Sequence, residues 1–153
     1  MALGVTSCAQ FIYDAYISDD KMKTFFHGHS YTANPTACSA ALASMDLFDD
    51  PEIFADINRI ASRHNTFLQK IKDHPSLIEV RQLGTIIAFE IRTKEETHYL
   101  NSLAEQISNF FISKGIILRP LGNIVYILPP YCIKDEDLDY IYSAIDEFLD
   151  SCR

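Results

Sequence analysis

The 153-residue sequence lacks an excess of positive charge, since 13 lysines and arginines stand against 21 aspartates and glutamates and the formal net charge is −8. An acidic surface repels phosphate groups, so we expect neither nucleic-acid nor anionic-membrane binding. No uncharged apolar run approaches the roughly 20 residues that a membrane helix needs. The first residues also lack the basic segment of a secretory signal. We therefore expect a cytoplasmic protein.

Cysteine is sparse as well. Cys8, Cys38, Cys132 and Cys152 form no C-x-x-C pair, and such spacing without a secretory signal predicts reduced thiols. The sequence has no Walker motif, no G-x-G-x-x-G, no Ser-His-Asp order, no repeat and no low-complexity tract. What is present is 48% hydrophobic and 22% charged residues, which is typical of a globular protein.

The second half of the chain alternates predicted strands and helices. The expected elements are strands at 78–83 and 85–91, a helix opened by a capping box at 93–96 and closed by Lys114-Gly115, strands at 116–119 and 124–128, and a helix from Lys134. This order predicts an α+β unit over 75–153, with a small, mainly antiparallel sheet and helices on one face.

The first half has a looser pattern. We expect a short strand at 3–8, irregular structure and loops to about Thr32, and an Ala-rich helix over 36–48 that Asn34-Pro35 starts. A second helix, with apolar residues three and four positions apart, fills 51–74 and connects the two halves.

Two stretches carry candidate chemistry. The loop Gly28–Thr32 precedes the Asn34-Pro35 helix start, so its N–H groups and hydroxyls could cradle an anion, although such loops are usually only helix caps. His27 and His29 have no third ligand nearby, so we expect no metal site. Tyr31, Tyr126 and Tyr131 line a site or simply fill the core.

Arg119 is the more unusual residue, because it ends an apolar strand and precedes Pro-Leu-Gly. A planar guanidinium there suits bidentate capture of a carboxylate. The alternative is a structural ion pair with one of the many acidic residues, and the residues alone leave the two readings equal.

The stretches 25–44 and 119–131 resemble those of the class III, fold-type I aminotransferases that depend on pyridoxal phosphate, and Arg81–Gly84 fits the start of their small domain. The resemblance implies that 1–50 is a remnant of the large domain, with the phosphate-contacting loop. It further implies that 51–74 is a connecting helix and 75–153 the small C-terminal domain.

The resemblance also implies roles for single residues. Gly28, His29 and Ser30 match the loop that contacts the phosphate of pyridoxal phosphate bound by the partner subunit of a homodimer. Arg119 matches the arginine that binds the substrate carboxylate, and Leu121, where some relatives have Phe, lies beside the substrate chain.

The implied reaction, a step of biotin biosynthesis, moves the amino group of S-adenosylmethionine to 8-amino-7-oxononanoate and gives 7,8-diaminononanoate. The family's Schiff-base lysine lies in a Ser-Lys-Gly context, which none of the seven lysines here has. We therefore expect a C-terminal fragment that is inactive alone and has no catalytic residue of its own. The alternatives are another class III aminotransferase, acting on ω-amino acids, and a non-catalytic binding module.

Overall fold

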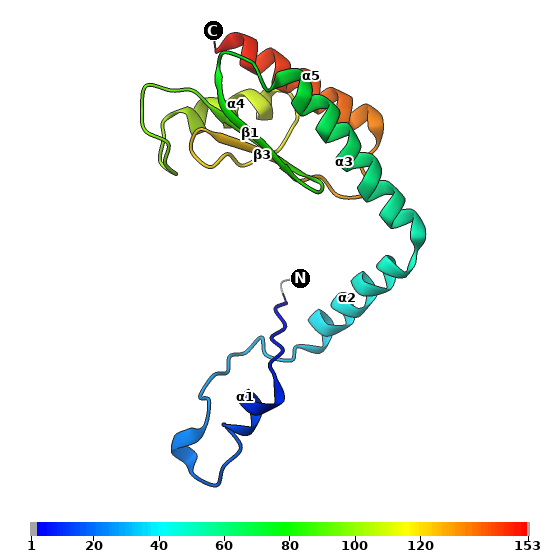
Figure 1. Ribbon diagram of the computed structural model, residues 1–153, viewed down its shortest axis with the longest axis vertical. Helices are drawn as coiled ribbons and strands as arrows, with labels where there is room; N and C mark the ends of the chain where they lie inside the picture. The colour runs from blue at the N-terminus through cyan, green and yellow to red at the C-terminus, as the bar shows by residue number, and fades with distance from the viewer. Residues whose placement is uncertain (1–2, 153) are drawn as a thin grey trace. The chain divides into compact units, whose positions relative to one another are not determined.

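The computed structural model describes residues 3–152, and the chain divides between Asp50 and Pro51 into two compact units (Figure 1). We call them the N-terminal unit and the C-terminal unit and describe each by itself. None of the helices in the described residues is long and apolar enough to cross a membrane.

The N-terminal unit is built from short helices and loops. Its elements are α1 (Gln10–Asp14), η1 (Lys21–Lys23), α2 (Pro35–Asp46) and η2 (Leu47–Asp49). The strand predicted at 3–8 is wrong, because this segment joins no ladder with any described residue. A strand persists only where a neighbouring strand pairs with its backbone N–H and C=O groups.

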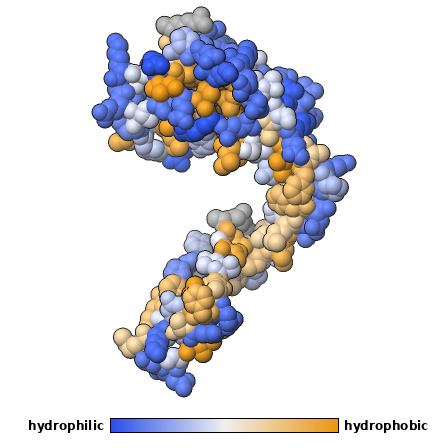
Figure 2. All heavy atoms as spheres, viewed as in Figure 1, coloured by the Kyte–Doolittle hydropathy of each residue, from blue (hydrophilic) through white to orange (hydrophobic). Residues whose placement is uncertain are grey.

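The start of α2 is as the sequence predicts. The side chain of Asn34 accepts a hydrogen bond from the N–H of Ala37 at 3.1 Å, and Pro35 occupies the first helical position. Ala37 is the one buried residue of the described part of this unit, and side chains such as Phe26 are 82% exposed. Apolar side chains therefore lie on its surface (Figure 2).

The C-terminal unit contains an antiparallel sheet in the order β1-β2-β3, formed by Leu77–Leu83, Ile86–Ile91 and Ile124–Ile127. The turn between β1 and β2 has Gly84 at φ +55°, a left-handed conformation that glycine adopts without strain. With three helices in the same unit, this confirms the predicted α+β fold with a small antiparallel sheet.

Three helices, α3 (Pro51–Ile71), α4 (Leu103–Ser113) and α5 (Asp135–Ser151), complete the unit. Alternate residues of β2 and β3 point to the helices, because strand side chains alternate between faces. These residues join one buried cluster with apolar residues of all three helices. From the strands, the cluster takes Leu77, Ile87, Phe89, Ile91, Val125 and Ile127.

One buried histidine links α3 to α5 and to the turn between β1 and β2. His64 of α3 is fully buried, and its Nδ1 lies 2.6 Å from the hydroxyl of Tyr142 on α5, while its Nε2 lies 3.1 Å from the carbonyl oxygen of Thr85. A neutral ring satisfies both contacts by donating to Thr85 and accepting from Tyr142. Burial lowers the pKa of His64, and burial also raises the pKa of Tyr142 to about 12.

Two predictions for this unit are wrong. The helix does not begin at the 93–96 capping box but at Leu103, and residues 92–102 form a loop. The hydroxyl oxygen of Thr93 accepts from the N–H of Glu95 at 3.2 Å. Such a local turn gives the backbone an alternative to the helix.

The strand predicted at 116–119 also fails to form. The segment has no ladder partner among the described residues, and only the isolated bridge between Leu121 and Ile124 remains of the predicted hairpin. The sheet of the described residues therefore has three strands, and a cavity lies between the 116–119 segment and β3.

Candidate functional site

The guanidinium of Arg119 is exposed and makes one side-chain hydrogen bond. Its Nη2 donates to the hydroxyl oxygen of Tyr99 at 2.6 Å, and its Cζ lies 6.0 Å from the centre of the Tyr99 ring. The hydrogen bond to Tyr99 is the main cause that raises the pKa of Arg119. Its other donors have no partner among the described residues.

The other described arginines behave differently. Arg59 and Arg63 pair with carboxylates of α5, and Arg81 pairs with a neighbouring glutamate. Arg92 donates to two main-chain carbonyl groups. Arg119, in contrast, forms no ion pair with any described carboxylate.

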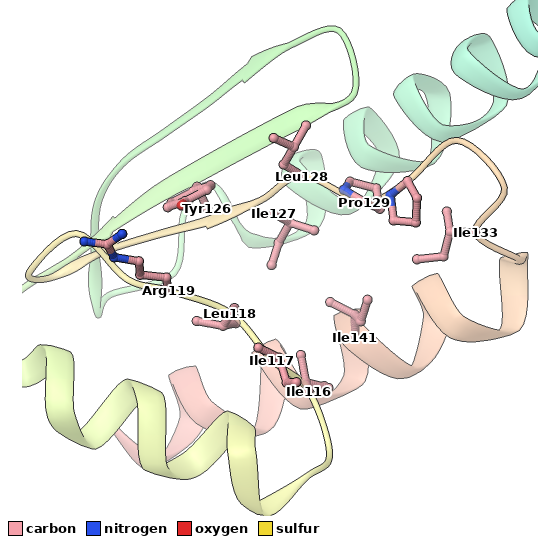
Figure 3. A pocket seen from close by; sticks show the side chains of 11 residues that line it. Ile116, Ile117, Leu118, Arg119, Tyr126, Ile127, Leu128, Pro129, Ile133 and Ile141 are labelled. Carbon is pink, nitrogen blue, oxygen red and sulfur yellow. The ribbon is translucent and has the colours of Figure 1, made fainter. Parts of the chain in front are cut away.

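A cavity of about 380 Å³ separates the 116–119 segment from β3 (Figure 3). Arg119 and Tyr126 lie at one end, while Ile133 lies at the other. The remaining lining residues are apolar: Ile116, Ile117, Leu118, Ile127, Leu128, Pro129, Pro130 and Ile141. A cavity lined by apolar side chains, with a guanidinium at one end, has the chemistry to hold an aliphatic carboxylic acid.

Of the three other residues predicted near this site, one lines the cavity and two do not. Tyr126 does line the cavity, as the sequence allowed. Leu121 is 41% exposed in the turn after Arg119 and is not part of the lining. Tyr131 packs against the core instead, which is the second of the two roles left open for it.

The second candidate, the loop at Gly28–Ser30, is exposed in the N-terminal unit. The N–H of His29 donates to the hydroxyl of Thr32 at 3.3 Å, and Nδ1 of His29 accepts from the N–H of Tyr31 at 3.2 Å. The hydroxyl and the N–H of Ser30 have no hydrogen-bond partner among the described residues. Both donors of Ser30 are therefore free for an anion.

The helix after this loop offers less to an anion than the sequence suggested. The N–H of Ala37 is one of the donors that the start of α2 leaves without a helical partner, and it already donates to the side chain of Asn34. The rings of His27 and His29 lie 5.7 Å apart, and the described residues contain no cluster of three metal-ligating side chains. Tyr31 is 77% exposed.

Tyr99 is the residue that sequence reasoning missed. It was expected within or beside the helix after the capping box, yet it lies in the 92–102 loop and contacts Arg119, 20 residues further along the chain. No spacing rule relates two residues so far apart outside regular structure.

Comparisons with known proteins identify relatives of the chain. The family model described as Aminotransferase class-III matches residues 1–149. The chain is 38% identical over 150 residues to adenosylmethionine-8-amino-7-oxononanoate aminotransferase of Synechococcus elongatus, covering 98% of this chain and 35% of that protein.

Solved structures of aminotransferases are also similar to this chain. The crystal structure of adenosylmethionine-8-amino-7-oxononanoate aminotransferase from Methanocaldococcus jannaschii matches with a TM-score of 0.74 and 29% identity, covering 89% of this chain and 33% of that one. An omega-aminotransferase from Paracoccus denitrificans matches with a TM-score of 0.72 and 27% identity, covering 86% and 30%. The chain spans about a third of the length of the curated relatives it matches. Because the family model covers nearly the whole sequence, the chain belongs to the class III aminotransferases.

Proposed function

We propose that this chain forms the C-terminal third of an aminotransferase of biotin biosynthesis that works as a cytoplasmic homodimer. The enzyme moves the amino group of S-adenosylmethionine to 8-amino-7-oxononanoate and so produces 7,8-diaminononanoate. The observation that carries the proposal is the exposed guanidinium of Arg119, which has no carboxylate partner among the described residues. The identity of 38% to a relative that bears this enzyme's name supports it.

Arg119 binds the carboxylate of the oxo acid in this proposal. A guanidinium forms two parallel hydrogen bonds to a carboxylate, and such charge-assisted bonds are stronger than neutral ones. The cavity beside Arg119 is lined by apolar side chains, so an aliphatic chain that enters it leaves water at little polar cost. Carboxylate and chain together would orient the substrate.

Class III aminotransferases depend on pyridoxal phosphate, and the Ser30 loop fits its phosphate. Both donors of Ser30 are free among the described residues, and the loop is exposed, as a contact with a partner subunit requires. Gly28, His29 and Ser30 would hold the phosphate, with Ser30 donating through its hydroxyl and its N–H. The cofactor, when bound, supplies the electron sink that amino-group transfer needs.

None of the seven lysines has the sequence context of the Schiff-base lysine, so that lysine would come from polypeptide outside this chain. The chain's own residues in this scheme bind and orient. Ser30 fixes the cofactor phosphate, and Arg119 fixes the acceptor carboxylate.

The test is an amino-transfer assay on the full-length protein that contains this chain, with 8-amino-7-oxononanoate as acceptor. We expect mass spectrometry to detect 7,8-diaminononanoate when S-adenosylmethionine is the donor. Absence of that product from active, cofactor-loaded protein would exclude the proposed reaction.

A second candidate is a class III aminotransferase that acts on ω-amino acids, because an omega-aminotransferase structure matches almost as well as the first. The same assay separates the two when the donor is varied. Transfer from alanine or an ω-amino acid, without transfer from S-adenosylmethionine, would favour the second candidate.

A further inference from the structure

The loop that carries Tyr99 is packed directly on the turn that follows Arg119. Gly122 in that turn has φ +64°, and a Cβ built there would lie 1.9 Å from the carbonyl oxygen of His98. Only glycine therefore lets the backbone of residue 98 approach this closely. The turn and the loop meet within one residue of Tyr99.

Two buried asparagines hold the loop in place. Asn123 donates from Nδ2 to the carbonyl oxygen of Ile91 at 2.8 Å and to the hydroxyl of Thr97 at 3.1 Å. Asn101 donates to the hydroxyl of Thr93 and to the carbonyl oxygen of Glu96, both at 3.1 Å. Asn123 and Asn101 are 0% and 2% exposed, and the bond from Asn123 to Ile91 is buried, where a hydrogen bond is stronger than in water. Tyr99 therefore lies on a loop that the hydrogen bonds of Asn101 and Asn123 hold in place.

We propose that Tyr99 is a positioning residue for substrate recognition: its hydroxyl holds the Arg119 guanidinium in the orientation that receives the substrate carboxylate. The inference rests on the proposed function, whose acceptor substrate has that carboxylate.

The geometry of the pair explains how Tyr99 acts. An arginine side chain has many rotamers, and fixing it at the moment of binding costs conformational entropy. The Tyr99 hydroxyl engages Nη2 alone, so Nε and Nη1 keep free donors for a carboxylate. The partner of Arg119 is a hydroxyl and not a carboxylate, unlike the partners of the arginines that pair with aspartate or glutamate.

The experiment compares Tyr99→Phe with Tyr140→Phe in the full-length protein. The two tyrosines are matched, because Tyr99 is 56% exposed and Tyr140 is 53% exposed, and each hydroxyl makes one hydrogen bond. Tyr140 donates to the carbonyl oxygen of Lys114 at 2.8 Å and contacts no part of Arg119.

We expect Tyr99→Phe to raise the KM for 8-amino-7-oxononanoate about tenfold, because binding must then fix a freely rotating arginine side chain. The kcat should change less than about twofold, since the bond acts on binding. Tyr140→Phe should leave both constants unchanged. A KM for Tyr99→Phe equal to that of the wild type, or an equal rise in Tyr140→Phe, would overturn the inference.

A double variant separates positioning from a general structural effect. In an Arg119→Ala background, Tyr99→Phe should have no further effect on KM, because the group that it positions is gone. Additive effects would contradict the assignment.

Failure of the proposed function is recognised independently, by wild-type protein that makes no 7,8-diaminononanoate. Binding of hexanoate, measured by calorimetry, then replaces KM as the readout. Weaker binding by Tyr99→Phe alone would support the Tyr99–Arg119 pair as a carboxylate site, and unchanged binding would reject it.

Discussion

The two units of the molecule differ in what surrounds their apolar side chains. In the C-terminal unit these side chains enclose one another in a cluster formed by the sheet and three helices. In the described part of the N-terminal unit only Ala37 is buried, and large aromatic side chains are exposed. Side-chain caps thus start η1 and α2 of the N-terminal unit, whereas α4 and α5 of the C-terminal unit have no side-chain cap and are held by a buried core.

The largest expected effect is on the free energy of unfolding, and it should differ between two phenylalanines, one from each unit. Phe89 is 1% exposed in the core, so Phe89→Ala should lower the free energy of unfolding by about 3–5 kcal/mol. Phe26 is 82% exposed, so Phe26→Ala should change it by less than about 0.5 kcal/mol. Urea unfolding followed by circular dichroism measures both. Similar losses in the two variants would contradict the contrast between the units.

Two glycines offer a second contrast. Gly122→Ala should destabilise the C-terminal unit by about 2–3 kcal/mol, because its φ is positive and a Cβ would meet the carbonyl oxygen of His98. Gly28 has no atom within 4 Å of a built Cβ and no positive φ, so Gly28→Ala should be almost neutral. Urea unfolding measures the free energy of unfolding of both variants. A Gly122→Ala protein as stable as the wild type would mean that the 92–102 loop packs elsewhere.

The pH dependence of stability tests the buried His64 of the C-terminal unit. Because burial lowers the pKa of His64 in the folded state, the unfolded chain binds a proton that the folded chain does not as the pH falls below about 6.5. Stability should therefore fall with decreasing pH, by at most about 1.4 kcal/mol per pH unit from this group.

Unfolding between pH 7 and pH 5 measures this slope. His64→Gln should reduce it relative to the wild type. An unaltered slope in His64→Gln would show that protonation of His64 does not oppose folding.

The exposed apolar surface of the N-terminal unit predicts behaviour in solution. The 153-residue chain should self-associate, because large exposed apolar surfaces favour association. Light scattering at micromolar concentration checks this, with residues 51–153 alone as the comparison. A monodisperse monomer of the whole chain would favour a binding module over a part of a larger enzyme. The isolated chain should also catalyse no transfer and show no borohydride-sensitive absorbance.

Local signals in the sequence predicted much of the fold. The Asn34-Pro35 start of α2, the adjacent strands at 78–83 and 85–91 and the helix from Lys134 each depend on neighbouring residues. The strands at 3–8 and 116–119 were wrong because a strand also needs a partner, which its own residues do not determine.

The candidate site could be predicted only in part, because the contacts of its residues involve segments far apart in the sequence. Residue chemistry and family resemblance singled out Arg119, but the choice between ion pair and free guanidinium depended on residues far along the chain. Tyr99 was missed because its role comes from the packing of Gly122 against His98, a contact between two irregular segments.

The most direct test of the account is the KM for 8-amino-7-oxononanoate in Arg119→Ala full-length protein, with Arg81→Ala as the matched control. Arg81 is exposed and paired with Glu79, so its loss should leave KM unchanged. Loss of a charge-assisted, bidentate contact predicts an increase in KM of about 100-fold for Arg119→Ala. A KM within about twofold of the wild type in Arg119→Ala would contradict the claim that this arginine recognises the substrate carboxylate.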